Sequence, residues 1–308
     1  MGTIKAICVS PGKGTAKRPV DTAVLKEDWG IEGDAHAGTW HRQVSLLAKE
    51  SIEAFRAKGA DVLFGDFGEN LVTEGVDLSG ARVGMRITAG DAELVVTQIG
   101  KACHTACAIR EKVGDCIMPR EGIFARVTRG GTIRPGDAIT LLPADPERPF
   151  TAAVITLSDR CFAGEREDKS GPEVARILTE KGYTVEETLL LPDGKERLMA
   201  ELMRLADQRQ IDVIFTTGGT GFAPRDLTPE ATEAVCDRKA PGIAEAIRQY
   251  SLSITPHAML SRQTSGIRKH TLIVNLPGST KACREDLDFI LGPLSHGLGL
   301  LRGEQLDP

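Results

Sequence analysis

The residues of this chain best suited to chemistry lie in a glycine-rich stretch that runs from Thr216 to Ala231. It follows the apolar run 213–215, which is typical of a buried strand, and it leads into a helix for which Thr228 is the predicted N-cap. Pro229 suits the first helical position. A strand, a glycine loop and a helix in this order direct backbone N–H groups toward an anion. The stretch has neither the Gly-Lys-Ser/Thr ending of a Walker A loop nor the spacing of a dinucleotide fingerprint.

The same loop also carries charged side chains. Arg225 and Asp226 place a cation and a carboxylate at its mouth, the pair that a phosphate with bound Mg²⁺ requires. A glycine loop of this kind can equally be a tight turn without a ligand, and spacing alone leaves both interpretations open. The residues expected to hold the anion are Gly218, Gly219, Thr220, Gly221 and Arg225.

Strands and helices alternate after residue 150, which predicts an α/β fold with a doubly wound parallel sheet. Ligands of such sheets bind outside the carboxyl ends of the strands, so the loops that follow the strands are expected to meet at one rim. The predicted strands are 151–157, 185–191, 212–217 and 271–276, and the predicted helices are 171–181, 196–209, 229–235, 242–252 and 280–301. The candidate rim residues outside the glycine loop are Ser158, Asp193, Asn275, Pro277, Gly278 and Ser279.

Two carboxylates of this rim, Asp193 and Asp226, are expected to share a magnesium ion. Mg²⁺ takes one or two protein carboxylates and completes its octahedron with water and substrate phosphates. Asp193 lies in a Pro-Asp-Gly sequence and, taken alone, is better read as a turn residue. Only its expected place opposite Asp226 favours a role in metal binding.

The first half of the chain has a different pattern. Short β runs broken by glycine turns cover 82–99 and 123–142 and predict a mostly-β barrel-like or sandwich domain. Three prolines in the seven residues 143–149 are typical of a linker. The predicted organisation is therefore one domain over 1–143, a linker over 144–150 and a second domain over 151–308.

Composition limits the possible partners. A formal net charge of −5 and 4% aromatic residues give no support to nucleic-acid or anionic-membrane binding. The N-terminus is too short in apolar length for a signal peptide, and no apolar run approaches a membrane span. Seven cysteines, an odd number without a secretory signal, predict free thiols and a cytoplasmic location.

The C-terminal half resembles the molybdopterin adenylyltransferase (MogA/MoaB-like) family over residues 150–302, through the segments 158–160, 167–171, 216–231 and 275–279. The resemblance implies transfer of AMP from Mg-ATP to the terminal phosphate of molybdopterin, with Asp226 and Asp193 as the catalytic, metal-binding residues. It also implies that the glycine loop, Ser279, Asp168 and Ser170 line the pterin and nucleotide pockets. A homo-oligomer, by resemblance a trimer, and other proteins of molybdenum cofactor biosynthesis are the further partners implied.

The N-terminal half resembles a MOSC domain over about 1–142, through the segments 30–34, 42–47, 67–71, 98–103 and 122–127. The resemblance implies that Cys103 carries sulfur or ligates the molybdenum of the cofactor. The usual proline-cysteine pair reads Ala102-Cys103 here, and His104 and Cys107 are added, which leaves the chemistry of this domain open.

Three interpretations of these cysteines remain. Cys103 and Cys107, with Cys116, have the residue types of a zinc site but not its usual spacing. They are otherwise buried inert thiols, or Cys103 is a functional thiolate favoured by Lys101 and Arg110. Asp34 and His36 either shape a pocket or belong to a polar turn. The other cysteines, predicted to be packing residues, are Cys8, Cys161, Cys236 and Cys283.

Three functions are therefore compatible with the sequence. The first is an adenylyltransferase with an accessory cofactor-binding domain, which the presence of both Asp193 and Asp226 favours. The second is a non-catalytic molybdopterin carrier or scaffold. The third is a cofactor sulfur transferase that acts through Cys103.

Overall fold

The computed structural model describes residues 1–13, 15–101 and 116–303, and it divides the chain into two compact units, Met1–Arg148 and Pro149–Pro308. The division falls within the proline-rich segment that predicts a linker. Each unit has its own buried core. Within the described ranges, no helix is long and apolar enough to cross a membrane.

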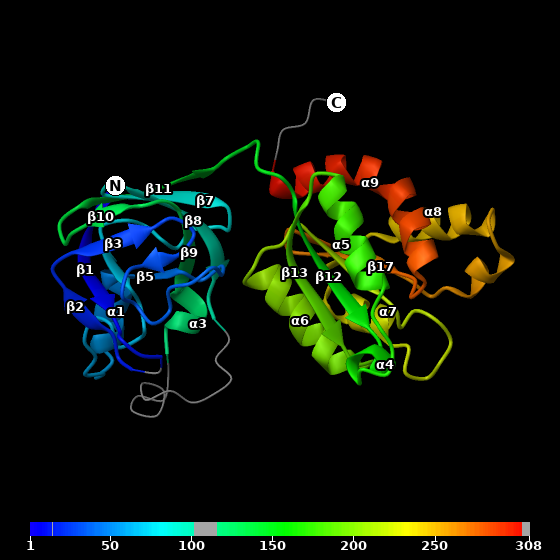
Figure 1. Cartoon of the computed structure of the whole chain (residues 1–308), viewed down its shortest axis with the longest axis horizontal. Helices are drawn as coiled ribbons and strands as arrows, with labels where there is room; N and C mark the ends of the chain where they lie inside the picture. Colours follow the sequence, from blue (N-terminus) through cyan, green and yellow to red (C-terminus); the bar gives the residue numbers. More distant parts are fainter. Residues whose placement is uncertain (14, 102–115, 304–308) are drawn as a thin grey trace. The chain divides into compact units, whose positions relative to one another are not determined.

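The N-terminal unit is a β-barrel (Figure 1). Its strands pair in the order β11-β7-β8-β9-β5-β6-β1, and an additional pairing of β11 with β1 closes the ring. Every second residue of β8 is buried, as expected of a strand with one face turned to the core. Of the two β architectures that the sequence allowed, the barrel is the one observed. The elements of this unit are β1 (Gly2–Val9), β2 (Arg18–Val20), β3 (Ala23–Lys26), β4 (Gly30–Ile31), β5 (Val44–Ala48), α1 (Lys49–Arg56), β6 (Leu71–Glu74), β7 (Met85–Ala89), β8 (Ala92–Ile99), α3 (Met118–Glu121), β9 (Ile123–Arg129), β10 (Gly131–Ile133) and β11 (Ala138–Ala144).

The C-terminal unit is a three-layer α/β structure. Its sheet has the order β13-β12-β14-β17-β16-β15, in which the first four strands are parallel. The elements are β12 (Thr151–Leu157), α4 (Asp159–Phe162), α5 (Ser170–Glu180), β13 (Thr184–Leu191), α6 (Lys195–Asp207), β14 (Val213–Thr217), α7 (Thr228–Val235), β15 (Arg238–Lys239), α8 (Pro241–Leu252), η1 (Pro256–Leu260), β16 (Ser265–Arg268), β17 (Thr271–Leu276) and α9 (Thr280–Arg302).

Helices cover both faces of this sheet. Apolar residues of α5, α8 and α9 pack on one face, and those of α6 and α7 pack on the other. The four predicted strands and five predicted helices are all present, with ends that differ by one or two residues. The expectation of a wholly parallel sheet was incomplete, because the short strands β16 and β15 extend it antiparallel at one edge.

One buried carboxylate in this unit makes its stability depend on pH. Asp286 of α9 is 1% exposed and accepts a hydrogen bond of 2.9 Å from the Ser251 hydroxyl of α8. Burial, with a smaller effect from Glu285, raises the pKa of Asp286 to about 6 from an ordinary value of 3.8. The folded state therefore binds this proton more tightly than the unfolded state, and stability falls as pH rises from about 4 to about 6.

Asp286→Asn removes that ionisation while it keeps an oxygen for Ser251. We expect the variant to be as stable as the parent near pH 4 and more stable by about 2–3 kcal/mol above pH 6, since one pKa unit corresponds to about 1.4 kcal/mol. Amide hydrogen exchange of α9, measured from pH 4 to pH 8, checks this. Tryptophan fluorescence would report on the N-terminal unit instead, because both tryptophans, Trp29 and Trp40, lie there. A stability difference that does not change with pH would contradict the prediction.

Candidate functional site

The topology of the C-terminal sheet makes the loops after β12 and β14 diverge at the carboxyl edge of the sheet, which is called the rim below. The chain leaves β12 toward β13 on one side of it, and it later returns to β14 on the other side. The loops after β12 and β14 therefore diverge at the carboxyl ends of neighbouring strands, the usual ligand position of such sheets. The glycine loop follows β14 at this switch point.

Two glycines give this loop its shape. Gly218 has φ +96°, and a Cβ atom there would lie 2.4 Å from the carbonyl oxygen of Leu157, at the end of β12. Gly219 has φ +64°, and a Cβ atom would lie 2.3 Å from the Thr228 hydroxyl. That hydroxyl donates a 2.9 Å hydrogen bond back to the Gly218 carbonyl. The loop is therefore packed against β12 and against the start of α7, with room only for glycine at both positions.

The two predicted metal ligands both lie against this loop. The Cβ position of Gly219 is 3.8 Å from Asp193 Oδ1, and that of Gly221 is 2.9 Å from Asp226 Oδ2. Arg225 lies beside them, with its Nε 3.7 Å from Asp193 Oδ2. The structure thus brings Asp193, Arg225 and Asp226 together from two loops that are about thirty residues apart in the sequence.

Both carboxylates have one oxygen occupied. Asp193 Oδ2 accepts the N–H of Asp159 at 3.1 Å, and Asp226 Oδ2 accepts the N–H of Ala223 at 2.9 Å. In the part of the chain that the structure describes, neither Oδ1 atom has a hydrogen-bond partner. Two carboxylates with one spare oxygen each beside a loop of N–H groups fit Mg²⁺, which keeps water and phosphate oxygens as its remaining ligands.

Asp193 is partly buried and lies close to two other carboxylates. Burial raises its pKa, the negative charges of Asp159 and Asp226 raise it further, and the Asp159 N–H and the Arg225 guanidinium oppose this effect. A cation bound between these groups would reverse the repulsion. Asp159, which also accepts the N–H of Asp193 at 3.0 Å, belongs to the segment 158–160 that the sequence places at this rim, although it is not one of the predicted site residues.

The other predicted rim residues play different parts. Ser158 Oγ accepts the N–H of Cys161 and so caps α4, and Gly278 and Ser279 are exposed just before α9. The Cβ position of Gly278 is 3.4 Å from the Gly218 Cα atom, so the last loop touches the glycine loop. The Pro277 carbonyl accepts hydrogen bonds from Thr217 and Cys283.

Asn275 has no exposed surface. Its amide nitrogen donates to the hydroxyls of Thr216 and Thr232, each at 2.9 Å, and its oxygen accepts the N–H of Thr264. These bonds use its polar atoms inside the protein. Asn275 therefore stabilises the carboxyl ends of β14 and β17, and it is not part of the proposed ligand-binding residues.

Asp168 and Ser170 lie at the start of α5. Asp168 Oδ1 accepts the N–H groups of Ser170 and Gly171, each at 3.1 Å. A cavity of about 240 Å³ opens beside them, and its lining residues are Val154, Thr156, Asp168, Gly171, Pro172, Thr188, Leu189 and Leu190. Its wall is mostly apolar, with one carboxylate at its edge, as in small-ligand pockets, but its volume is below their usual range of about 300–1,000 Å³.

The N-terminal unit has a buried polar cluster where the sequence left a pocket or a turn open. Lys17 Nζ contacts both oxygens of Asp34 at 2.8 Å, and both side chains are almost fully buried. Burial raises the pKa of Asp34, but the nearby His36 side chain, the Lys17 ammonium and the Ser10 N–H outweigh it and hold the pKa well below its usual range. Asp34 is therefore an ionised structural anchor.

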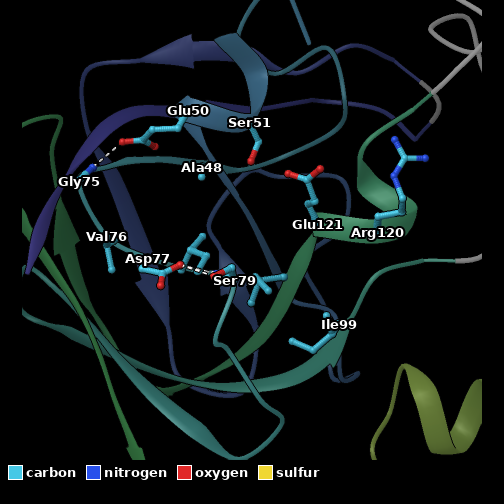
Figure 2. A pocket seen from close by; sticks show the side chains of 12 residues that line it. Ala48, Glu50, Ser51, Gly75, Val76, Asp77, Ser79, Ile99, Arg120 and Glu121 are labelled. Atoms are coloured by element: carbon cyan, nitrogen blue, oxygen red, sulfur yellow. Dashed lines mark hydrogen bonds between the residues drawn. The ribbon is translucent and has the colours of Figure 1, made fainter. Parts of the chain in front are cut away.

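A cavity of about 500 Å³ lies in this unit. Figure 2 shows Glu50 and Ser51 of α1, Asp77 and Ser79 of the β6–β7 connection, and Arg120 and Glu121 of α3 around it. Three carboxylates and one guanidinium at its edge disfavour an anionic ligand such as a pterin phosphate. This cavity is therefore a poor candidate for a molybdopterin site.

The predicted chemistry of Cys103, Cys107 and His104 lies outside the described residues. Among the described cysteines, Cys8 and Cys283 have no exposed surface, as predicted for packing residues, whereas Cys161 and Cys236 are partly exposed. Burial raises the thiol pKa of Cys8 and Cys283 to about 12. Across the described ranges, no group of three or more His, Cys, Asp or Glu residues is placed to hold a metal ion.

Known proteins resemble both units. The family model "Probable molybdopterin binding domain" matches residues 153–296, and the MOSC domain model matches residues 33–140. A molybdopterin adenylyltransferase of Helicobacter pylori is 39% identical over 155 residues, which are 50% of this chain and 88% of that protein. One from Escherichia coli is 44% identical over 139 residues, 44% of this chain and 71% of that protein.

A longer relative matches the same half. Gephyrin of Dictyostelium discoideum is 39% identical over 168 residues, which are 51% of this chain but only 23% of gephyrin. These relatives each match about half of this chain, and the MOSC model matches residues 33–140 of the other half. The chain belongs to the molybdopterin-binding (MogA/MoaB-like) family through its C-terminal unit, to which an N-terminal MOSC domain is fused.

Proposed function

We propose that the protein acts in molybdenum cofactor biosynthesis as a molybdopterin adenylyltransferase, with the reaction in the C-terminal unit. The observation that carries this proposal is the meeting of Asp193, Arg225 and Asp226 at the glycine loop. Relatives that carry the name molybdopterin adenylyltransferase are 39% and 44% identical over this unit and support it.

In the proposed reaction, Asp193, Arg225 and Asp226 act mainly through their charges. The attacking group is a phosphate, which is already ionised at neutral pH and has little need of a general base. Bound Mg²⁺ would neutralise charge on the ATP phosphates. Asp193 and Asp226 would hold that ion with their spare oxygens, the N–H groups of the loop would receive an anionic oxygen, and Arg225 adds a positive charge at the mouth.

The N-terminal unit is proposed to bind the cofactor or to transfer sulfur to it. The resemblance to MOSC domains assigns this role to Cys103, which lies outside the described residues, and the acidic 500 Å³ cavity is not part of the proposal. Other proteins of cofactor biosynthesis are proposed partners, and the C-terminal unit is proposed to form a homo-oligomer.

One incubation separates the three functions. We expect the full chain, given molybdopterin and Mg-ATP, to release pyrophosphate and to yield a pterin product heavier than molybdopterin by one AMP. Mass spectrometry of the pterin and of the protein checks both. Pterin binding without pyrophosphate release would indicate a carrier. A low-molecular-weight persulfide, added to the same incubation as the sulfur donor, tests the third function, because a persulfide on Cys103 without the AMP adduct would indicate a sulfur transferase.

A further inference from the structure

Arg262, which lies outside the sequence motifs, donates hydrogen bonds to four residues of the 216–231 stretch. It lies between η1 and β16, 36 residues after Asp226. Its backbone N–H donates to the Thr220 carbonyl at 3.0 Å, and its Nε donates to the Gly221 carbonyl at 2.8 Å. Its two terminal nitrogens donate to the Asp226 carbonyl and to the Glu230 carboxylate.

These bonds hold the two ends of the 221–226 segment together, at what is called here the neck of the loop. Gly221 and Asp226 are the two ends of the segment that carries Phe222 and Arg225 at its exposed tip, and one guanidinium bonds the carbonyls of both ends. Inside the segment, Asp226 bonds Ala223 twice, by its N–H to the Ala223 carbonyl and by Oδ2 to the Ala223 N–H. The direction of the Asp226 carboxylate is therefore tied to a neck that Arg262 holds.

Arg262 is itself held in place. Arg248 of α8 donates to the carbonyl oxygens of Ser261 at 3.1 Å and Gln263 at 2.8 Å, on either side of Arg262. The loop is thus connected to a helix of the opposite layer through two arginines in series. A planar guanidinium with donors in fixed directions can join two carbonyls and a carboxylate at once, which a lysine ammonium on a flexible stem cannot reproduce.

Stability alone is a weak explanation of this arrangement. The side chains of Arg262 and Glu230 are 34% and 41% exposed, and ion pairs of that exposure contribute only about 0–1 kcal/mol. What the contacts supply is a fixed geometry for a carboxylate whose proposed partner demands near-ideal octahedral coordination. Preorganised groups stabilise a transition state without reorganisation during the reaction.

We infer that Arg262 is the positioning residue of the site: by closing the Gly221–Asp226 neck, it fixes the Asp226 carboxylate for metal and phosphate binding. The inference rests on the proposed adenylyl transfer for its kinetic consequence. Its structural consequence, the order of the loop, does not depend on that reaction.

The test compares Arg262→Ala and Arg262→Lys with Arg268→Ala in the full chain. Arg268 is a matched control, because its guanidinium also bonds a carboxylate, that of Asp207, and a backbone carbonyl, that of Val235, but makes no contact with the loop. We expect Arg262→Ala to lower kcat by roughly 10- to 100-fold, the scale of an ångström-sized misplacement, and to change the KM for molybdopterin by less than about threefold. The apparent Mg²⁺ requirement should rise, and Arg262→Lys should recover little activity.

Two further readouts separate positioning from folding. Amide hydrogen exchange at residues 222–227 should be faster in Arg262→Ala and unchanged in Arg268→Ala. Guanidinium ion at millimolar, non-denaturing concentration should restore part of the lost turnover to Arg262→Ala and none to Arg268→Ala.

The possible results are distinct. Unchanged loop exchange and unchanged kcat in Arg262→Ala would overturn the inference, as would an equal loss in the Arg268→Ala control. If the parent protein transfers no AMP and yet Arg262→Ala loosens the loop, the proposed function fails while the positioning role of Arg262 is supported.

Discussion

Asp226→Asn is expected to lower adenylyl transfer by about 10²-fold or more, the scale of losing one preorganised electrostatic contact. The substitution keeps the shape of the side chain and its Oδ acceptor for the Ala223 N–H, but it removes the charge that the proposed Mg²⁺ ion needs. Molybdopterin binding should survive, because the loops hold the pterin. Steady-state turnover and equilibrium pterin binding, measured on the same variant, check the two halves of this expectation.

The dependence of the variant's turnover on Mg²⁺ and on pH distinguishes metal binding by Asp226 from proton transfer. Higher Mg²⁺ should partly restore the Asn variant, whereas higher pH should not, since no proton transfer through Asp226 is proposed. Asp237→Asn is the matched control, because Asp237 also accepts one backbone N–H, that of Lys269, but directly precedes the edge strand β15, away from the rim. An Asp226→Asn enzyme with parental turnover, or one restored by pH alone, would remove Asp226 from the mechanism.

Gly218→Ala is expected to damage both the stability and the activity of the C-terminal unit. A non-glycine residue at φ +96° is strained, and its Cβ would lie 2.4 Å from the backbone carbonyl of Leu157, which cannot move without disturbing β12. We expect a loss of about 3 kcal/mol, since such strain costs about 1–3 kcal/mol and the backbone clash adds to it. The melting temperature of this unit should then fall by roughly 6–12 °C, at about 2–4 °C per kcal/mol.

Gly242→Ala serves as the control for that experiment. Gly242 lies in α8, where no atom lies within 4 Å of the Cβ position, so the substitution should be neutral or stabilise by about 0.4–1 kcal/mol. Calorimetry of the three proteins compares the effects directly. A Gly218→Ala protein with the melting temperature and turnover of the parent would show that the loop adapts to a side chain, and the tight packing described above would then not matter for function.

The sequence predicted the C-terminal unit better than the N-terminal one. Long amphipathic helices and apolar strands of five or more residues can be recognised from the periodicity of their hydrophobic residues. The predicted bounds of β12, β14 and α6 therefore agree with the observed ones to within about one or two residues. The strands β16 and β15 carry no such signal, because Ser265–Arg268 includes one strongly apolar residue and Arg238–Lys239 includes none. In the folded sheet, β16 pairs with the edge of β17 and β15 pairs with β16, so both depend on tertiary pairing.

By itself, the sequence determined the residue types of the site: glycines where positive φ is required, and a carboxylate and a guanidinium beside them. It could not show that the Asn275 side chain makes its hydrogen bonds inside the protein and is not free for a ligand. Those bonds go to three threonines that lie 11 to 59 positions away in the sequence. It also gave no sign of Arg262, whose partners lie 32 to 42 residues earlier in the chain. Only the folded sheet brings these groups together, since it is the crossing of the chain from one side of β12 to the other that places distant loops at a single rim.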